Sequence, residues 1–439
     1  MANTRYLPID SALFIETRKR FIAKLKPNSL AVFNSNDIMP TNADGIMAFR
    51  QNNDLFYLSG VDQEESILLL FPDCKDEKYR EVLFLRETNE EIAVWHGAKL
   101  NKEQAIQTSG IKTIFWLDQF ESIFNLLMGR CDHVYLNTNE HGRAIVEVET
   151  RDARFIKWCR EKYPLHHYER SAILMQHLRA IKTNKEVELI KHACNITEKG
   201  FRRILKFVKP GVTEYEIEAE FSHEFLKNRS RGFAYGPIIA SGADSCILHY
   251  INNNKVCKEG DILLLDVAAE YANYASDLTR ALPVNGKFSK RQKEVYNAVL
   301  RVMKFATSKL IVGNTATEYE KEVGLLMQEE LIKLGLLKAD EVKKQNHEAP
   351  LYKRYFMHNA SHFLGLDVHD VGNFQRPFEA GMVFTCEPGI YIREEGLGIR
   401  LENNILITEK GNIDLMKNIP LEPEEIEELM AEKKLVESL

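Results

Sequence analysis

His358, His362 and His369 lie close together in the segment HNASHFLGLDVHD, called here the histidine segment (residues 358–370), in a chain with 13 histidines. His358 and His362 are four residues apart, as in helical zinc motifs, but the glutamate that such motifs place between them is missing. Imidazole groups bind metal ions, carry protons or serve only as polar loop residues. The segment alone leaves these three interpretations open.

Asp266 and Asp277 both lie in the strongly β-patterned stretch 261–285. Its apolar runs predict a hairpin that turns near residues 271–272. A turn centred there places Asp266 directly opposite Asp277, because each is the same distance from the centre.

Glu387 and Glu402 both lie in a second β-patterned stretch, residues 382–408. It predicts a hairpin that turns at residues 394–396 and places Glu387 opposite Glu402. The Pro-Gly pair at 388–389 could introduce a bulge, which would shift this register.

Opposed side chains of an antiparallel pair have Cβ atoms about 4.5–5.5 Å apart. Carboxylates this close repel each other unless they are protonated or neutralised. The four negative charges of two such pairs would balance the four positive charges of two divalent metal ions. The histidine segment is well placed to add a nitrogen ligand. Carboxylate-rich coordination with an imidazole favours Mn²⁺, with Co²⁺, Fe²⁺ or Zn²⁺ as alternatives. Two adjacent metal ions activate water and polarise a carbonyl group, which indicates hydrolysis.

The elements that carry these residues form an internal repeat. Thr183–Glu186 and Ser289–Gln292 are both predicted capping boxes that open long helices. Each helix is followed by a similar motif, KPGVTEYE at 209–216 and IVGNTATEYE at 311–320, which opens another helical stretch. A predicted pair of strands follows in each half.

Residues 1 to about 170 alternate helical and extended patterns, which is typical of an α/β domain with a mainly central sheet. Helical patterns cover Ala12 to Leu25 and Arg151 to Lys162, and the periodicity lapses near Pro164 to Ser171. The predicted strands are SLAVFN, LFYLSGV, SILLLF, EVLFL, TIFWL and HVYLN. We predict an α/β (α+β) protein with domains 1–172 and 173–439.

The composition limits the classes of protein to which this chain could belong. A chain of 439 residues with 44% hydrophobic and 28% charged residues is an ordinary globular composition. The net charge of −6 and the lack of a long basic run argue against nucleic acid or an anionic membrane as partner. No apolar run approaches the ~20 residues of a membrane helix, and no signal peptide is evident. Seven scattered cysteines without a CxxC pair favour the reducing cytoplasm.

The acidic residues and the second histidine resemble, in their order along the chain, the five-ligand pattern of the "pita-bread" metallopeptidases, in particular the aminopeptidase P and prolidase branch. The matching segments are LLLDVAAEYANYASDLTR, SHFLGLDVHD, CEPGIYI and GIRLENN. RQNNDLFYLSGVDQEES resembles the aminopeptidase P N-terminal domain. The resemblance implies an N-terminal α/β domain followed by a pita-bread fold with an internal pseudo-two-fold repeat.

The resemblance also implies roles for individual residues. Glu387 would act as general base in addition to binding metal, since its second oxygen stays close to the attacking water. Arg400 would offset negative charge and orient a ligand, and Tyr391 would form hydrogen bonds behind the ligands. His358 and His369 would line the substrate site, and His249 would lie over the scissile bond. The implied metal ligands are Asp266, Asp277, His362, Glu387 and Glu402.

Further residues match family positions outside this set. Trp95 and Asp44 resemble N-terminal-domain residues that approach the active site, often that of a neighbouring subunit, which implies a homodimer or homotetramer. Arg376 would partly replace a family arginine in the substrate wall. The loops that precede Glu387 and Glu402 are shorter than is typical, so they leave the peptide-length preference open.

The implied activity is removal of the N-terminal residue from peptides with proline in the second position. The imide bond to proline lacks an N–H group, so ordinary peptidases do not process it. The nearest alternative is a prolidase, which cuts only Xaa-Pro dipeptides. A non-catalytic pita-bread binding module is a further alternative, but such modules have generally lost metal ligands.

Overall fold

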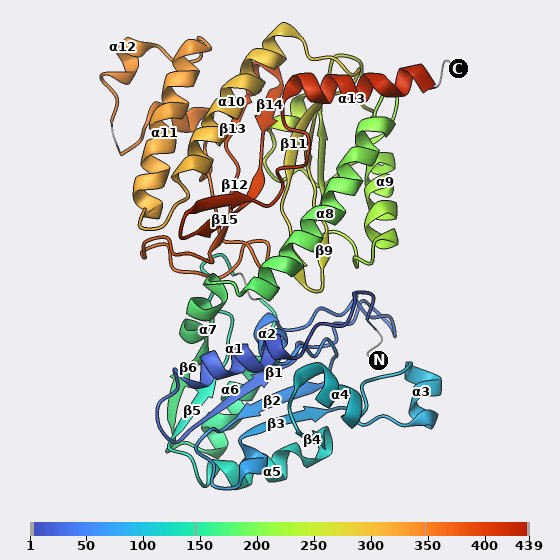
Figure 1. The fold of residues 1–439 in the computed structure, drawn as a ribbon, viewed down its shortest axis with the longest axis vertical. Helices are drawn as coiled ribbons and strands as arrows, with labels where there is room; N and C mark the ends of the chain where they lie inside the picture. Colours follow the sequence, from blue (N-terminus) through green and yellow to red (C-terminus); the bar gives the residue numbers. More distant parts are fainter. Residues whose placement is uncertain (1–3, 145–146, 347, 437–439) are drawn as a thin grey trace. The chain divides into compact units, whose positions relative to one another are not determined.

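The computed structural model describes residues 4–144, 147–346 and 348–436. The chain forms two compact units, Met1–Leu178 and Arg179–Leu439 (Figure 1). This division falls six residues after the predicted end of the first domain at residue 172. Within the described ranges, no helix combines the length and apolar character needed to span a bilayer.

The first unit is built around a six-stranded mixed sheet with the order β4-β3-β2-β1-β5-β6. All residues of the two central strands β1 and β2 are buried, because helices and loops cover both faces. The strands are β1 Ser29–Asn34, β2 Ser66–Leu70, β3 Glu81–Leu85, β4 Thr113–Trp116, β5 His133–Leu136 and β6 His167–Arg170. The helices are α1 Ala12–Ile22, α2 Asn53–Ser59, α3 Glu90–His96, α4 Lys102–Ser109, α5 Phe120–Met128 and α6 Arg151–Lys162. Helix α7, Ser171–Ala180, begins in this unit and its last two residues belong to the second.

Five of the six predicted strands of this unit are confirmed, but LFYLSGV is not a strand. It lies largely in helix α2, because the side chain of Asn52 accepts hydrogen bonds from the N–H groups of Asp54 and Leu55. Gly60, with φ +69°, ends the helix. A capped apolar run of this length forms a short buried helix as readily as a strand.

The second unit repeats one arrangement, in which two helices are followed by a three-stranded sheet (Figure 1). The first half contains α8 Asn184–Phe207, α9 Glu214–Lys227, β7 Ile238–Ser241, β8 Ile262–Asp266, β9 Glu270–Tyr271, β10 Tyr274–Ala275 and β11 Thr279–Pro283. The second half contains α10 Lys290–Lys309, α11 Ala316–Lys333, α12 Ala339–Val342, β12 Val383–Cys386, β13 Gly389–Ile392, β14 Leu397–Arg400, β15 Asn403–Thr408, β16 Gly411–Asp414 and α13 Pro423–Val436. Both predicted capping boxes, at the starts of α8 and α10, are confirmed.

The Glu-Tyr-Glu motifs of the two halves occupy different positions in their helices. Thr213 caps α9 and pairs with Glu216, whereas Thr315 caps α11 and pairs with Glu318. Aligned by these caps, the motif of α11 lies two residues further along the helix. The structural equivalent of Glu320 is therefore Glu218, not Glu216.

The first hairpin differs from its predicted register. Strand β8 pairs with β11 so that Asp266 lies opposite Thr279, not Asp277. The turn is made by Ala272 and Asn273, with φ 52° and 69°, as in a type I′ turn. The shift of two residues keeps both aspartates on one face of the hairpin, where they are diagonal neighbours.

The predicted register of the second hairpin is confirmed. Cys386 pairs with Asn403 on one side and Gly389 pairs with Arg400 on the other. These pairs bracket Glu387 and Glu402, which are therefore opposite each other. The Pro-Gly pair at 388–389 interrupts the strand without shifting the register.

Candidate metal centre

Backbone hydrogen bonds bring the two hairpins together. The Glu402 N–H donates to the Thr279 carbonyl over 3.0 Å, and the buried guanidinium of Arg280 donates to the Glu402 carbonyl over 2.7 Å. The side-chain amide of Asn404 both accepts from the Asp277 N–H and donates to the Asp277 carbonyl. The four carboxylates of the twin hairpins therefore converge.

The histidine segment runs antiparallel to β12, at the place that β7 takes beside β8 in the first half. Thr385 N–H donates to the His362 carbonyl over 2.9 Å, and Phe363 pairs with Phe384. Because of this pairing, His362 points at the same carboxylates as the two hairpins.

The ligand atoms of Asp277, His362 and Glu402 all lie within 4.8 Å of one another. His362 Nε2 is 3.4 Å from Asp277 Oδ2 and 3.4 Å from Glu387 Oε1. His362 Nδ1 lies 2.9 Å from the Phe363 carbonyl, to which it donates, so Nε2 is the nitrogen presented to a metal ion.

The acidic residues show the electrostatic cost of this convergence. Burial is the largest cause that raises the pKa values of Asp266, Glu387 and Glu402, and neighbouring carboxylates raise them further. The pKa of Glu387 reaches about 7, and that of Glu402 lies well above its ordinary value. Burial alone would lower the pKa of His362, but Asp277 and Glu387 raise it.

Burial first, and then the closeness of like charges, favours the protonated form of these carboxyl groups. Divalent cations relieve the same repulsion and bind oxygen and imidazole ligands. The donor set of four carboxylates and one oriented imidazole therefore fits a divalent metal centre.

A hydrogen-bonded chain of side chains begins at Asp266, one of the converging carboxylates. Arg400 donates to Asp266 Oδ2 over 2.6 Å and to the Tyr391 hydroxyl over 2.8 Å. Tyr391 in turn donates to His358 Nε2 over 2.8 Å, and His358 Nδ1 donates to the Asn359 carbonyl. Burial and Arg400 lower the pKa of His358 to about 3, so its imidazole is neutral.

Of the remaining candidate residues, some lie beside the converging carboxylates and others lie away from them. The ring of half-buried His369 packs edge-to-face on His362, with centroids 4.4 Å apart. His249 is exposed in a turn, and its charge contributes to the lowered pKa of His358. Arg376 is exposed and pairs with Glu379 at 2.9 Å, outside the ligand cluster. Trp95 is 83% exposed and Asp44 is also exposed; both belong to the first unit, and their approach to an active site stays a prediction.

Several residues of the centre were missed at the sequence level. The Tyr235 hydroxyl donates to Asp266 Oδ1 and the Thr279 hydroxyl to Glu402 Oε2, both over 2.6 Å. Glu320 of α11 accepts a hydrogen bond from the Ala360 N–H over 2.9 Å and so ties the histidine segment to α11. Burial raises the pKa of Glu320 to about 7. The available signals were the polar Thr279 within an apolar strand and, for Glu320, the repeated Glu-Tyr-Glu motif, whereas Tyr235 lies outside any strand.

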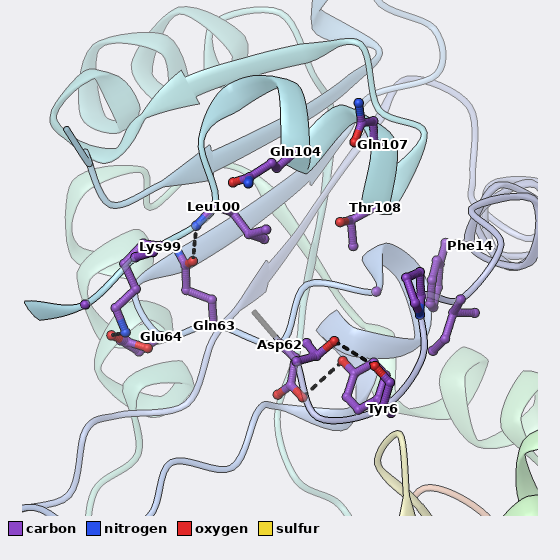
Figure 2. Close-up of a pocket in the computed structure, with 16 residues that line it drawn as sticks. Tyr6, Phe14, Asp62, Gln63, Glu64, Lys99, Leu100, Gln104, Gln107 and Thr108 are labelled. Carbon is purple, nitrogen blue, oxygen red and sulfur yellow. Dashed lines mark hydrogen bonds and ion pairs between the residues drawn. The ribbon is translucent and has the colours of Figure 1, made fainter. Parts of the chain in front are cut away.

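A cavity of about 420 Å³ lies in the first unit, between the N-terminal segment and α4 (Figure 2). Its polar groups largely bind one another: Tyr6 donates to Asp62, the Leu100 N–H donates to Gln63, and Lys99 pairs with Glu64. None of the candidate ligand residues lines it.

Comparison with known proteins agrees with this geometry. Residues 188–409 match the sequence model of metallopeptidase family M24, and residues 14–135 match that of the aminopeptidase P N-terminal domain. The chain belongs to the aminopeptidase P family. The Xaa-Pro aminopeptidases of Haemophilus influenzae and Escherichia coli are each 34% identical to it, over 95% of this chain and 96% and 97% of theirs.

Solved structures of the family share the whole fold. The aminopeptidase of Pseudomonas aeruginosa matches with a TM-score of 0.89 at 32% identity, covering 97% of this chain and 99% of that one. Zinc-substituted Escherichia coli aminopeptidase P, in complex with product, matches with a TM-score of 0.85 at 32% identity and covers 97% and 99%. Family membership confirms the expected N-terminal domain and metallopeptidase domain and makes the chain a hydrolase. The prolidase alternative is not favoured.

Proposed function

We propose that this chain is a dinuclear metal-dependent aminopeptidase that releases the N-terminal residue from peptides with proline in the second position. The observation that carries the proposal is the convergence of four carboxylates and the Nε2 atom of His362 in a chain of the M24 family. We assign Asp266, Asp277, His362, Glu387 and Glu402 as ligands of two divalent ions, with Mn²⁺ first and Co²⁺, Fe²⁺ or Zn²⁺ as alternatives.

The ions, when bound, lower the pKa of water and polarise the scissile carbonyl group. Glu387 accepts the proton of the attacking water, a role that suits a carboxyl group whose side chain keeps 19% exposure beside buried partners. Arg400 compensates the charge of Asp266 and holds Tyr391, which keeps the neutral His358 in place. His369 contacts the substrate and stabilises the developing negative charge, and His249 closes over the scissile bond.

The substrate side of the site draws on more of the molecule. We propose that Arg376 contributes to the wall beyond the scissile bond. Trp95 and Asp44 reach the active site of a neighbouring subunit in a homodimer or homotetramer; the 80% and 83% exposure of Val94 and Trp95 supports such a contact. Seven buried cysteines without a disulfide support a cytoplasmic location.

The role of Glu387 is tested with the E387Q variant. We expect kcat on an Xaa-Pro-Yaa tripeptide to fall about 10²- to 10⁴-fold, because the amide cannot accept the proton. The matched control is E395Q in the turn of the same hairpin, where Glu395 pairs with Arg291, and it should stay within about twofold of wild type. Wild-type activity on Xaa-Pro dipeptides alone, or full activity of E387Q, contradicts the proposal.

A further inference from the structure

A cluster of buried charges, which the proposed chemistry does not use, adjoins the metal centre. Asp370 directly follows His369, and its carboxylate accepts from Arg179 over 2.5 Å and from Lys182 over 3.1 Å. The side chains of Asp370, Arg179 and Lys182 are 1%, 5% and 1% exposed. These three residues are called here the Asp370 cluster.

Such a cluster is a poor source of stability. Removing three charges from water costs about as much as their mutual attraction returns, so an apolar replacement of similar volume is often equally stable. Burial alone would raise the pKa of Asp370, but Arg179 and Lys182 bring it below its ordinary value, so the carboxylate stays charged. We therefore look for the role of the cluster in the backbone geometry that it fixes and not in a contribution to stability.

The cluster closes a tight backbone loop between His362 and His369. The Asp370 N–H donates to the Phe363 carbonyl over 2.8 Å, and the Gly365 carbonyl accepts from the Ala275 N–H over 2.7 Å. A Cβ atom on Gly365 would lie 2.0 Å from Asp370 Oδ2, so the loop packs directly on the carboxylate. The loop begins at the proposed metal ligand and ends at the histidine whose ring packs on it at 4.4 Å.

The cationic side of the cluster is itself fixed. Arg179 lies at the end of α7, and Lys182 lies in the connection to α8, whose N-terminus is held by the capping box of Thr183 and Glu186. The Lys182 N–H donates to the Gly381 carbonyl over 2.9 Å, which ties this connection to the start of β12. Asp370 is therefore anchored to backbone that is bonded to the second sheet.

We propose that Asp370, held by Arg179 and Lys182, is a positioning residue that sets the imidazole of His369 against the substrate. The inference rests on the proposed function, because it assigns His369 to the substrate. Displacement of a reacting or stabilising group by about 1 Å reduces rates about 100-fold. Loss of the Asp370 carboxylate should therefore slow the reaction by displacing His369.

The test is a double-substitution cycle with the D370N and H369A variants, measured as kcat/KM on an Xaa-Pro-Yaa tripeptide per folded, Mn²⁺-loaded chain. We expect D370N to lower kcat/KM about 10- to 100-fold in the wild-type background and less than about twofold in the H369A background. D367N is the matched control, since Asp367 is the exposed partner of the same Arg179, and it should stay within about twofold. Equal losses in both backgrounds overturn the inference.

Two further measurements keep the test decisive. If D370N does not fold, the milder K182M variant, which leaves Arg179 in place, enters the same cycle. Hydrogen exchange at the Gly365 and Asp370 amides is independent of activity: we expect faster exchange in the variant at these amides and unchanged exchange in α10. An inactive wild-type enzyme refutes the proposed function only, whereas unchanged exchange at the loop amides refutes the positioning role.

Discussion

Two of the proposed acidic ligands are oriented by hydrogen bonds from neighbouring hydroxyl groups, and a third is held through its backbone. Tyr235 donates to Asp266, Thr279 to Glu402, and Asn404 holds the backbone of Asp277. A carboxylate that is held in this way points its lone pairs in a fixed direction, which lowers the cost of assembling a metal site. The hydroxyl and amide partners are therefore part of the centre.

The Y235F variant tests this role of the partners. We expect Mn²⁺ affinity to fall about 10- to 100-fold, because Asp266 loses an orienting hydrogen bond. Titration of the chelator-treated protein with Mn²⁺ measures the change. Y250F is the matched control, since the Tyr250 hydroxyl donates to the buried carboxylate of Glu214, which is not a candidate ligand. Equal affinities of Y235F and Y250F speak against the proposed orientation.

The raised pKa values predict how metal-free protein responds to pH. The pKa of Glu387 rises from 4.5 to about 7 on folding, so the folded state binds the proton more tightly than the unfolded chain. This contribution to stability is present below about pH 4.5 and is lost as the pH rises through 7. We expect the thermal stability of chelated protein to decrease across this window, while Mn²⁺ affinity increases because fewer protons compete. Chelated E387Q should show a shallower decrease, and an increase in the stability of chelated wild type would be inconsistent with this account.

Sequence reasoning identified the converging acidic residues better than the groups that surround them. Glu387 and Glu402 are conspicuous because they interrupt apolar strands, and their register follows from the turn between them. Tyr235 and Glu320 could not be assigned in this way, since Tyr235 is 31 residues from Asp266 and only the folded chain brings the two together.

At the scale of elements, the hairpins and the helix starts determine where the proposed ligands lie. The first register was predicted wrongly because Ala272 and Asn273, which carry no glycine signal, form the turn at positive φ. The second was predicted correctly because Gly396, with φ +60°, ends its turn. A two-residue error leaves side chains on the same face, which is why the carboxylates still converge.

The capping box of α10 offers a test of the element boundaries. Ser289 accepts from the Gln292 N–H over 3.2 Å, so S289A should lower the free energy of unfolding by about 1 kcal/mol. S308A, the same change near the end of the same helix, should be close to neutral. Urea denaturation of the two variants measures the difference, and indistinguishable midpoints would argue against the cap.

For the whole molecule, two α/β units were predicted, and family membership confirms the N-terminal domain and the metallopeptidase domain. The apolar run LFYLSGV was misassigned because its helix depends on the cap by Asn52, a local hydrogen bond that outweighs strand propensity. The internal repeat was recognised from the motifs, but its true alignment follows the helix caps, which only the structure reveals.

The central claim is that the converging carboxylates exist to hold two divalent ions that the hydrolysis of an Xaa-Pro bond requires. The direct measurement is titration of chelator-stripped protein with Mn²⁺ while release of the first residue from an Xaa-Pro-Yaa peptide is followed. We predict no cleavage without metal, and activity that rises until two ions are bound per chain. Full cleavage by the stripped protein, or two bound ions without any cleavage, would contradict the claim.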